Sequence, residues 1–319
     1  MQNGQRCLRQ AAAAVPPRRD GAAPHTAAGG DTPCARFRHL PPPIILIGMH
    51  RSGTSLVAGM LHALGVYMGP DLRFPAPSDP PEVQEALRRA GYGEALPFRE
   101  INESLLKSAR AEWDRVTPFL QARGRAEDPY GERLLRALEG RSGEEFLAGR
   151  PEGWRGAWGW KDPRTSLTLP YWLKAFPQAR LIHVRRDPEA VARSLARRAA
   201  AQAPPRRDGT PLPPAQRLRW WLQNPGLTAR RLAWRLGLVP AETAAERQRC
   251  EDPAVSKELW RLYVAECERY RAHPGGYLEL DYEAIAGDPL GTAKTLARFG
   301  AIPATPDQLT AAASLVQAV

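Results

Sequence analysis

Long hydrophobic runs are missing from this sequence. No stretch reaches the roughly 18 consecutive apolar residues that a membrane-spanning helix needs, and the first residues contain no apolar core of a signal peptide. We therefore expect neither a membrane span nor a secretion signal.

Cysteine is scarce and unclustered. The chain has four cysteines, and no two of them form a C-x-x-C pair. This usage indicates reduced thiols, with neither a disulfide framework nor a zinc site. Together with the missing signal peptide, it leads us to expect a cytoplasmic protein that needs no metal.

Lysine is also scarce, with 5 lysines among the 45 basic residues, and the net charge of +11 is unevenly placed. Twelve arginines and only three acidic residues lie between residues 185 and 239. Such a region favours an anionic partner, and a small polyanion suffices. Nucleic acid is the alternative partner, but no nucleic-acid-binding motif accompanies the charge, so we consider it unlikely.

One stretch near the N-terminus organises the chain. Ile44 to Ile47 are apolar and mostly β-branched, which predicts a buried strand of a parallel sheet. A loop with two glycines follows, and then apolar residues recur at helical spacing, with Thr54 or Ser55 as the expected cap. A strand, a glycine loop and a helix N-terminus together form an anion site, because backbone N–H groups and the helix dipole favour negative charge there.

The loop lacks the lysine of a nucleoside triphosphate site. Gly48 and Gly53 have the spacing of G-x-x-x-x-G-K-[ST] and Ser55 supplies its hydroxyl, but Thr54 occupies the lysine position. The cation of the loop is Arg51, two residues before the second glycine. The pattern therefore predicts a site for an anion smaller than a triphosphate.

Two further motifs follow the same strand-then-loop pattern. Trp158-Gly159-Trp160-Lys161-Asp162-Pro163-Arg164 alternates like a strand and breaks at proline. Residues 181–184 predict another buried strand, followed by Arg186, a proline helix start and Ser194. Because ligands bind at the carboxyl ends of parallel strands, we expect Lys161 and Arg164 at the ligand-binding edge of the sheet.

The three motifs together resemble one family. The loop Gly48-Met49-His50-Arg51-Ser52-Gly53-Thr54-Ser55 is similar to the 5′-phosphosulfate loop of sulfotransferases that use 3′-phosphoadenylyl sulfate (PAPS), in particular bacterial members with a G-M-H-R-S-G-T-S loop. The W-x-W-K-D-P-R segment resembles their second signature, and an arginine with a serine eight residues later resembles their 3′-phosphate pair. The resemblance implies a P-loop-like α/β fold with a central parallel sheet flanked by helices.

The resemblance also implies roles for single residues. The donor PAPS would be bound by Arg51, Ser52, Gly53, Thr54, Ser55, Arg186 and Ser194. Arg51 and the N–H groups of Ser52 to Ser55 would stabilise charge on the departing 5′-phosphate. Glu94, in a segment similar to the family's G-Y-x-E, is the expected general base, and His50 is the second candidate. His183, inside a core strand, is expected to be structural.

Domain boundaries follow from composition. Residues 1–43 are rich in Ala, Gly, Pro and Arg, which predicts a disordered tail. Residues 44–319 form the expected sulfotransferase domain, with a Pro- and Arg-rich insertion at about 199–254. Within it we expect an amphipathic helix over residues 255–272, a strand over 277–283 and a helix over 289–299.

The expected reaction is in-line transfer of a sulfuryl group to a hydroxyl or amine of a small-molecule or glycan acceptor. A P-loop kinase is one alternative, although it requires lysine at position 54. A non-catalytic protein that binds anions or nucleic acid through residues 185–239 is the other. Neither the acceptor nor the oligomeric state follows from the sequence.

Overall fold

A computed structural model describes residues 34–70, 93–125, 128–150, 154–202 and 249–317. Most of the predicted insertion at 199–254 therefore lies outside the described residues, as do residues 1–33 of the predicted tail. The segment between Pro81 and Gly91, which precedes Glu94 in the sequence, also lies outside them.

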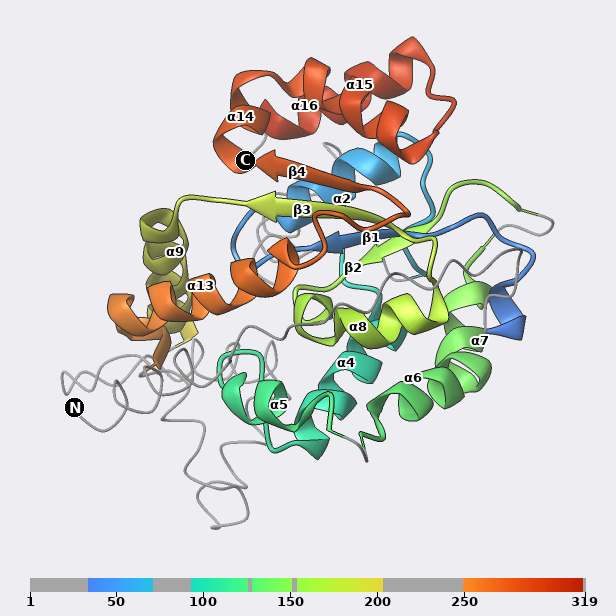
Figure 1. Ribbon diagram of the computed structural model, residues 1–319. Coiled ribbons are helices and arrows are strands. Elements are labelled where there is room, and N and C mark those ends of the chain that lie inside the picture. The colour runs from blue at the N-terminus through green and yellow to red at the C-terminus, as the bar shows by residue number, and fades with distance from the viewer. Residues whose placement is uncertain (1–33, 71–92, 126–127, 151–153, 203–248, 318–319) are drawn as a thin grey trace, which may run out of the picture.

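A parallel sheet forms the centre of the molecule (Figure 1). Its four strands are β1 (Ile44–Ile47), β2 (Gly159–Lys161), β3 (Arg180–Arg185) and β4 (Tyr277–Asp281). They lie in the order β2-β1-β3-β4, with Ile45 level with Trp160 on one side and with Leu181 on the other. This confirms the predicted α/β fold with a central parallel sheet. The last strand is shorter than predicted, because α14 begins at Tyr282.

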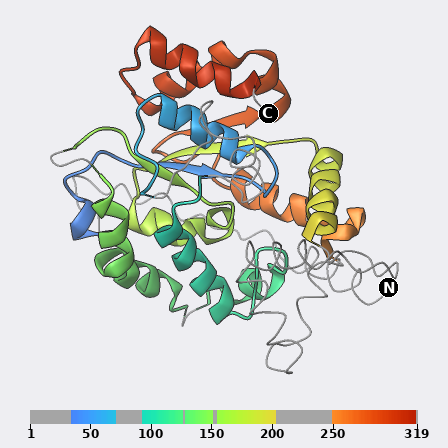
Figure 2. The same ribbon diagram turned by 180° about the vertical axis from the view of Figure 1, so that it is seen from behind.

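Helices cover both faces of the sheet (Figures 1 and 2). One face carries α2 (Thr54–Ala63), α14 (Tyr282–Gly287), α15 (Pro289–Gly300) and α16 (Pro306–Gln317). The opposite side carries α4 (Leu96–Ser108), α5 (Thr117–Ala122), α6 (Tyr130–Glu139), α7 (Arg141–Ala148), α8 (Thr165–Ala175), α9 (Pro188–Gln202) and α13 (Pro253–Glu268). The predicted helices at 255–272 and 289–299 are thus present as α13 and α15.

Alternation along the strands divides the core into two clusters. Ile45 and Ile47 of β1 pack with the side chains of α4, α8 and α13, whereas Ile44 and Leu46 pack with those of α2, α15 and α16. Successive strand residues point to opposite faces, so a strand that is buried on both faces must be apolar throughout. This is why the run Ile44 to Ile47 contains no polar residue.

The predicted disordered tail is wrong for residues 34–43. Cys34 is buried, and a short 3₁₀ helix, η1 (Ala35–Phe37), puts Phe37 into the core. The Phe37 ring stacks on Trp158 with the centroids 5.2 Å apart. Burying an aromatic side chain contributes a large hydrophobic stabilisation, which offsets the entropy of ordering this short segment.

The strand order explains where the site forms. The chain passes from β1 to β2 on one side and later places β3 on the other side of β1. In an open parallel sheet, ligands bind at the carboxyl ends of the strands where the order reverses in this way. The loops after β1 and β3 meet at this point.

Candidate active site

The loop after β1 has an unusual backbone. Gly48, Arg51 and Gly53 all have positive φ angles, of 141°, 70° and 91°. A Cβ atom on Gly48 would lie 2.4 Å from the carbonyl oxygen of Val184, and one on Gly53 would lie 2.3 Å from the ring of Tyr282. Both positions therefore require glycine. Left-handed and right-handed residues in sequence turn N–H groups into one concavity, which is typical of anion sites.

Helix α2 begins at this loop without a side-chain cap. Its N-cap is Gly53, and no side chain accepts a hydrogen bond there, so the predicted cap by Thr54 or Ser55 is wrong. No acidic residue lies in the first turn of α2. The positive end of the helix dipole is therefore open to an external anion.

The N–H of Ser52 is not part of that anion site. It donates to the carbonyl oxygen of Met49 over 3.2 Å and closes the loop turn, in contrast to the expectation that it faces the ligand. The N–H groups of Gly53 and Thr54 donate to no acceptor within the described residues. The hydroxyl of Ser52, by contrast, is buried and has no hydrogen-bond partner.

Arg51, Arg186 and Ser194, which the resemblance assigns to donor binding, lie together in the structure. The Nε of Arg51 donates to the Oγ of Ser194 over 3.0 Å, and an Nη of Arg186 donates to the carbonyl oxygen of Arg51 over 3.4 Å. The three residues come from the β1 loop, the end of β3 and the second turn of α9. The residues predicted to bind the 5′-phosphosulfate and those predicted to bind the 3′-phosphate thus form one contiguous cluster.

The positive charge in this cluster is not neutralised. Within the ranges that the structure describes, no carboxylate lies at salt-bridge distance from Arg51, Arg186 or Arg198. Burial lowers the pKa of Arg51, and the charges of Arg198, Arg186 and Arg197 lower it further. Arginine remains charged nevertheless, so these like charges repel one another until an anion compensates them.

Several buried polar atoms in the same place have no hydrogen-bond partner. They are the Oγ of Ser52, the Nε2 of His50 and the Nε of Arg186. An unpaired buried polar group typically costs about 1–3 kcal/mol, so such groups usually have a ligand or water as partner. The donors and hydroxyls present are therefore suited to a phosphate or sulfate group.

The sequence did not single out two residues of this cluster. Arg198 lies one helical turn after Ser194 on α9, and helical spacing alone could have indicated it. Tyr282 was assigned to a strand, but its ring lies 4.1 Å from the guanidinium carbon of Arg186. A cation over an aromatic face is stabilised electrostatically, so Tyr282 orients the Arg186 side chain. No sequence pattern indicates this contact.

A second charged cluster lies at the end of β2. Glu94 pairs with Lys161 as a short parallel bridge, and its carboxylate lies 3.3 Å from the Nζ of Lys161. The other Glu94 oxygen lies 3.5 Å from Arg164 and 3.8 Å from Arg99. Lys161 is only 2% exposed, so it is not a surface charge. Each cation of this second cluster has a carboxylate partner. The first cluster, which contains Arg51, Arg186 and Arg198 and is called the arginine cluster below, has none within the described residues.

Asp162 serves the structure of this cluster. Its carboxylate accepts hydrogen bonds from the backbone N–H of Arg164 at 3.1 Å and from the guanidinium of Arg164 at 2.8 Å. Its other oxygen accepts from Asn102 of α4 at 2.8 Å. Asp162 therefore fixes the turn between β2 and α8.

The two candidate bases differ in charge. Burial raises the pKa of Glu94, but the charges of Lys161, Arg164 and Arg99 outweigh it and hold the pKa below its usual value. Glu94 is therefore ionised at neutral pH. Burial first, and then Arg164, Arg198, Lys161 and Arg51, lower the pKa of His50 well below its usual value. His50 is therefore neutral, and cations of both clusters contribute to the lowering of its pKa.

Aromatic residues enclose His50. Its ring centroid lies 4.6 Å from that of Trp113 and 6.2 Å from that of Tyr263. Trp113 is partly exposed, whereas Tyr263 is fully buried. The partly exposed indole therefore gives His50 an apolar neighbour.

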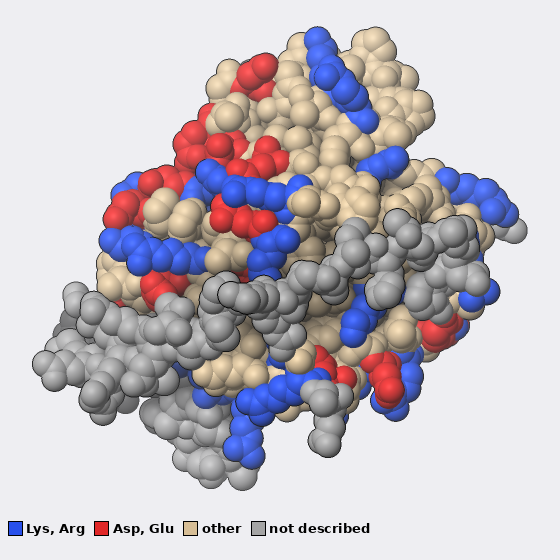
Figure 3. Space-filling view, viewed as in Figure 1, with Lys and Arg blue, Asp and Glu red and all other residues tan. Residues whose placement is uncertain are grey.

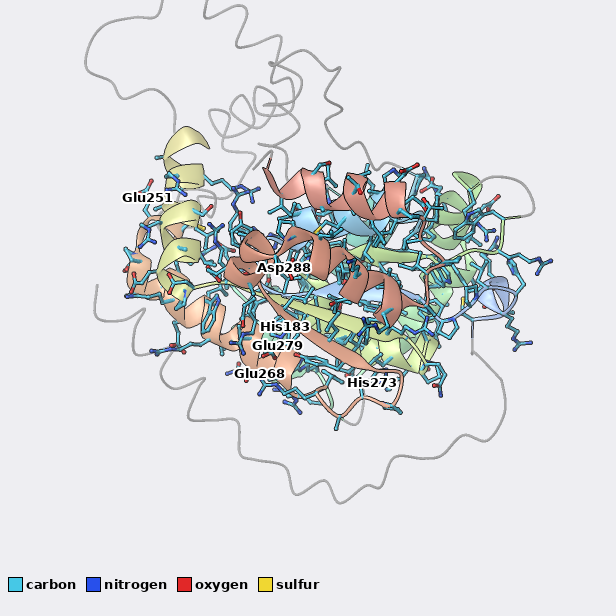
Figure 4. The ribbon with its side chains drawn as sticks, turned by 90° about the horizontal axis from the view of Figure 1, so that it is seen from above. His183, Glu251, Glu268, His273, Glu279 and Asp288 are labelled. Carbon is cyan, nitrogen blue, oxygen red and sulfur yellow. The ribbon has the colours of Figure 1, made fainter. Side chains whose placement is uncertain are left out.

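His183 lies on β3 but outside the site. Its ring is fully buried, and its Nδ1 lies 2.7 Å from the hydroxyl of Tyr277 and 3.7 Å from a carboxylate oxygen of Glu279 (Figure 4). Burial lowers the pKa of His183 to about 4, against the opposing effect of Glu279. These contacts hold β3 to β4 and agree with the structural role predicted for His183.

The exposed charge near β4 is mixed in sign. Arg185 pairs with Glu279 at 2.6 Å, and Arg271 pairs with Glu268 at 2.8 Å. Figure 3 shows blue and red side chains interleaved on this face. The described residues of this face therefore form no continuous basic surface of the kind that nucleic acid requires.

Metal and membrane features are also absent from the described part of the chain. It contains no group of three or more His, Cys, Asp or Glu residues that could hold a metal ion. None of its helices is long and apolar enough to cross a membrane.

Comparison with known proteins gives the family. A model described as the sulfotransferase family matches residues 42–246, which is more than half of the chain. No match was found among curated proteins.

Solved structures of similar fold include the sulfotransferase domain of the Synechococcus PCC 7002 olefin synthase, with 20% identity, a TM-score of 0.41 and coverage of 85% of this chain and 77% of that chain. They also include sulfotransferase STF1 from Mycobacterium tuberculosis H37Rv, with 18% identity, a TM-score of 0.43 and coverage of 86% and 71%. These structures are distant, and the family match is the finding that decides: the chain belongs to the sulfotransferase family.

Proposed function

We propose that this protein transfers a sulfuryl group from PAPS to an acceptor hydroxyl or amine. The observation that carries the proposal is the arginine cluster after β1 and β3, which has no carboxylate partner within the described residues and lies beside an uncapped helix N-terminus. A small polyanion with two separated phosphate groups matches this charge. When bound, PAPS supplies an activated sulfuryl group and a 5′-phosphate leaving group for in-line displacement.

The residues divide between the two ends of the donor. Arg51, the Ser52 hydroxyl and the N-terminus of α2, formed by Gly53, Thr54 and Ser55, would hold the phosphosulfate. Arg186 and Ser194 would hold the 3′-phosphate, because a guanidinium and a hydroxyl together bind a phosphate dianion well. Arg198 adds positive charge to the same cluster.

Glu94 is our proposed general base. It is ionised, it lies at the carboxyl end of β2, and it can accept the proton that an attacking hydroxyl must lose. Its ion pairs weaken it as a base in the ligand-free protein. His50 remains the second candidate, because its neutral ring has a buried nitrogen without a partner. Neither role requires a metal.

Within the residues that the structure describes, no observation favours a kinase or a nucleic-acid-binding protein. A kinase of this fold uses a lysine that Thr54 replaces, and the cations at the end of β2 already have carboxylate partners. The acceptor in our proposal is a small molecule or a glycan.

Thermal unfolding with product tests the proposal. Adenosine 3′,5′-bisphosphate (PAP) should raise the melting temperature, because a ligand that binds only the native state stabilises it. ATP with magnesium at the same concentration should stabilise the protein far less. Equal stabilisation by the two nucleotides would contradict the proposal.

A further inference from the structure

Helix α13 contains none of the residues proposed to hold the donor or to act as the base, yet it donates two hydrogen bonds to loops of the site. The indole Nε1 of Trp260 donates to the carbonyl oxygen of Arg186 over 3.1 Å. The hydroxyl of Tyr263 donates to the carbonyl oxygen of Trp113 over 2.7 Å. Residues three apart lie on the same face of a helix, so one face of α13 contacts both loops.

The bond from Trp260 fixes the backbone next to the proposed 3′-phosphate ligand. The first intrahelical bond of α9 runs from Val191 to the carbonyl of Asp187, so the carbonyl of Arg186 lies outside the helix. Trp260 supplies a donor to it. The Arg186 side chain is fixed separately by the Tyr282 ring and by its bond to the Arg51 carbonyl. Backbone and side chain of Arg186 are therefore both held before any ligand binds.

The bond from Tyr263 fixes the backbone that carries Trp113. Trp113 is at the tip of a tight turn in which Glu112 and Arg115 exchange backbone hydrogen bonds of 3.2 Å. Its ring packs against His50, with the ring centroids 4.6 Å apart. Burial raises the pKa of Tyr263 well above its usual value, so its hydroxyl remains a donor.

We propose that α13 positions both halves of the site, with Trp260 holding Arg186 for the nucleotide and Tyr263 holding Trp113 for the acceptor. This inference rests on the proposed sulfuryl transfer and deepens it. Both are positioning residues, because each acts through a backbone carbonyl rather than through substrate. Trp113 is then the apolar surface against which the acceptor packs beside His50.

Lys257 offers a matched control on the same helix. Its Nζ pairs with Glu189 of α9 at 2.8 Å, so it also joins α13 to α9. The side chains of Lys257 and Glu189 are 38% and 53% exposed, and an ion pair that solvent reaches to this extent contributes little. Removing it changes the α13–α9 contact without touching the Arg186 carbonyl.

The test compares three variants, Trp260→Phe, Tyr263→Phe and Lys257→Met. Each phenylalanine keeps a ring and removes one neutral hydrogen bond, which corresponds to roughly a two- to tenfold change in affinity. Trp260→Phe should raise the Kd for PAP and the KM for PAPS by this factor and leave the acceptor KM unchanged. Tyr263→Phe should raise the acceptor KM and leave the Kd for PAP unchanged. Lys257→Met should change neither.

The crossed pattern excludes a merely structural role, because general loosening would move both constants together. Equal changes in both constants, or none, would overturn the inference. PAP binding by the unaltered protein is measured first, since failure there refutes the proposed function rather than the role of α13. If a variant does not fold, hydrogen exchange of the unaltered protein tests the inference instead. PAP should slow amide exchange in α13 around Trp260, and unchanged exchange would also overturn the inference.

Discussion

Replacing Arg186 and Ser194 in separate variants measures how much the charge of Arg186 and the hydroxyl of Ser194 each contribute to the affinity for PAP. Arg186 contributes a cation that no described carboxylate neutralises, and a charge-assisted phosphate contact is worth about 1.5–3 kcal/mol. Arg186→Ala should therefore weaken PAP binding roughly 10- to 150-fold. Ser194 contributes one hydroxyl donor without a charge of its own, so Ser194→Ala should weaken binding less, by about tenfold, at the lower end of the same range.

Arg186→Lys is the control for geometry. It keeps the positive charge but loses the planar group that lies 4.1 Å from the Tyr282 ring, so its affinity should fall between wild type and alanine. Without ligand, Arg186→Ala should not destabilise the protein through loss of charge, because it relieves repulsion with Arg51. Its stabilisation by PAP should nevertheless be smaller.

Calorimetric titration with PAP at low and high salt is the assay. Affinity should fall with salt in the wild type and less steeply in Arg186→Ala, because one charged contact is gone. The reasoning fails if neither alanine variant changes the Kd, or if Ser194→Ala costs more than Arg186→Ala.

Three further predictions concern the base, the loop and pH. Glu94→Gln keeps the shape of the side chain but removes the base, so turnover should fall by roughly 10²–10⁴-fold with PAP affinity nearly unchanged. Arg51→Ala should lower both the turnover and the PAP affinity. Near-normal turnover in Glu94→Gln would contradict the role of Glu94 and make His50 the candidate base. Gly53→Ala should abolish PAP binding and lower the melting temperature, because the φ angle of Gly53 is 91° and the new methyl group would lie 2.3 Å from the Tyr282 ring. A wild-type Kd for PAP and a wild-type melting temperature in this variant would refute the loop geometry. His183 has a folded pKa of about 4, below its unfolded value of about 6.5, so its contribution to stability is complete above pH 6.5 and is lost, up to about 3 kcal/mol, as the pH falls towards 4. An NMR titration in which the His183 ring becomes charged near pH 6.5 would contradict this.

The sequence predicts the strands and the loop because their determinants are local. Ile44 to Ile47 can only be a strand buried on both faces, and Gly48 and Gly53 allow a backbone that other residues resist. The spacing from Arg186 to Ser194 likewise places both residues at one junction of strand and helix. That the Arg51 side chain then reaches Ser194 depends on the pairing of β1 with β3.

The remaining contacts depend on segments far apart in the chain. Tyr282 and Trp260 reach Arg186 from about 75–95 positions away, and no local pattern encodes either contact. Phe37 lies in a segment whose composition indicates disorder, but one aromatic side chain that packs on Trp158 suffices to order its end. The N–H of Ser52 is taken up by the turn itself, which depends on the φ angle of Arg51 rather than on the motif.

The most direct test of the central claim is sulfuryl transfer itself. The protein is incubated with sulfur-labelled PAPS and a pooled metabolite extract, and the labelled products are separated. The account predicts labelled acceptor together with an equal amount of PAP, greatly reduced in Glu94→Gln and Arg51→Ala. Absence of labelled acceptor from every extract, in a preparation that binds PAP no better than ATP with magnesium, would contradict it.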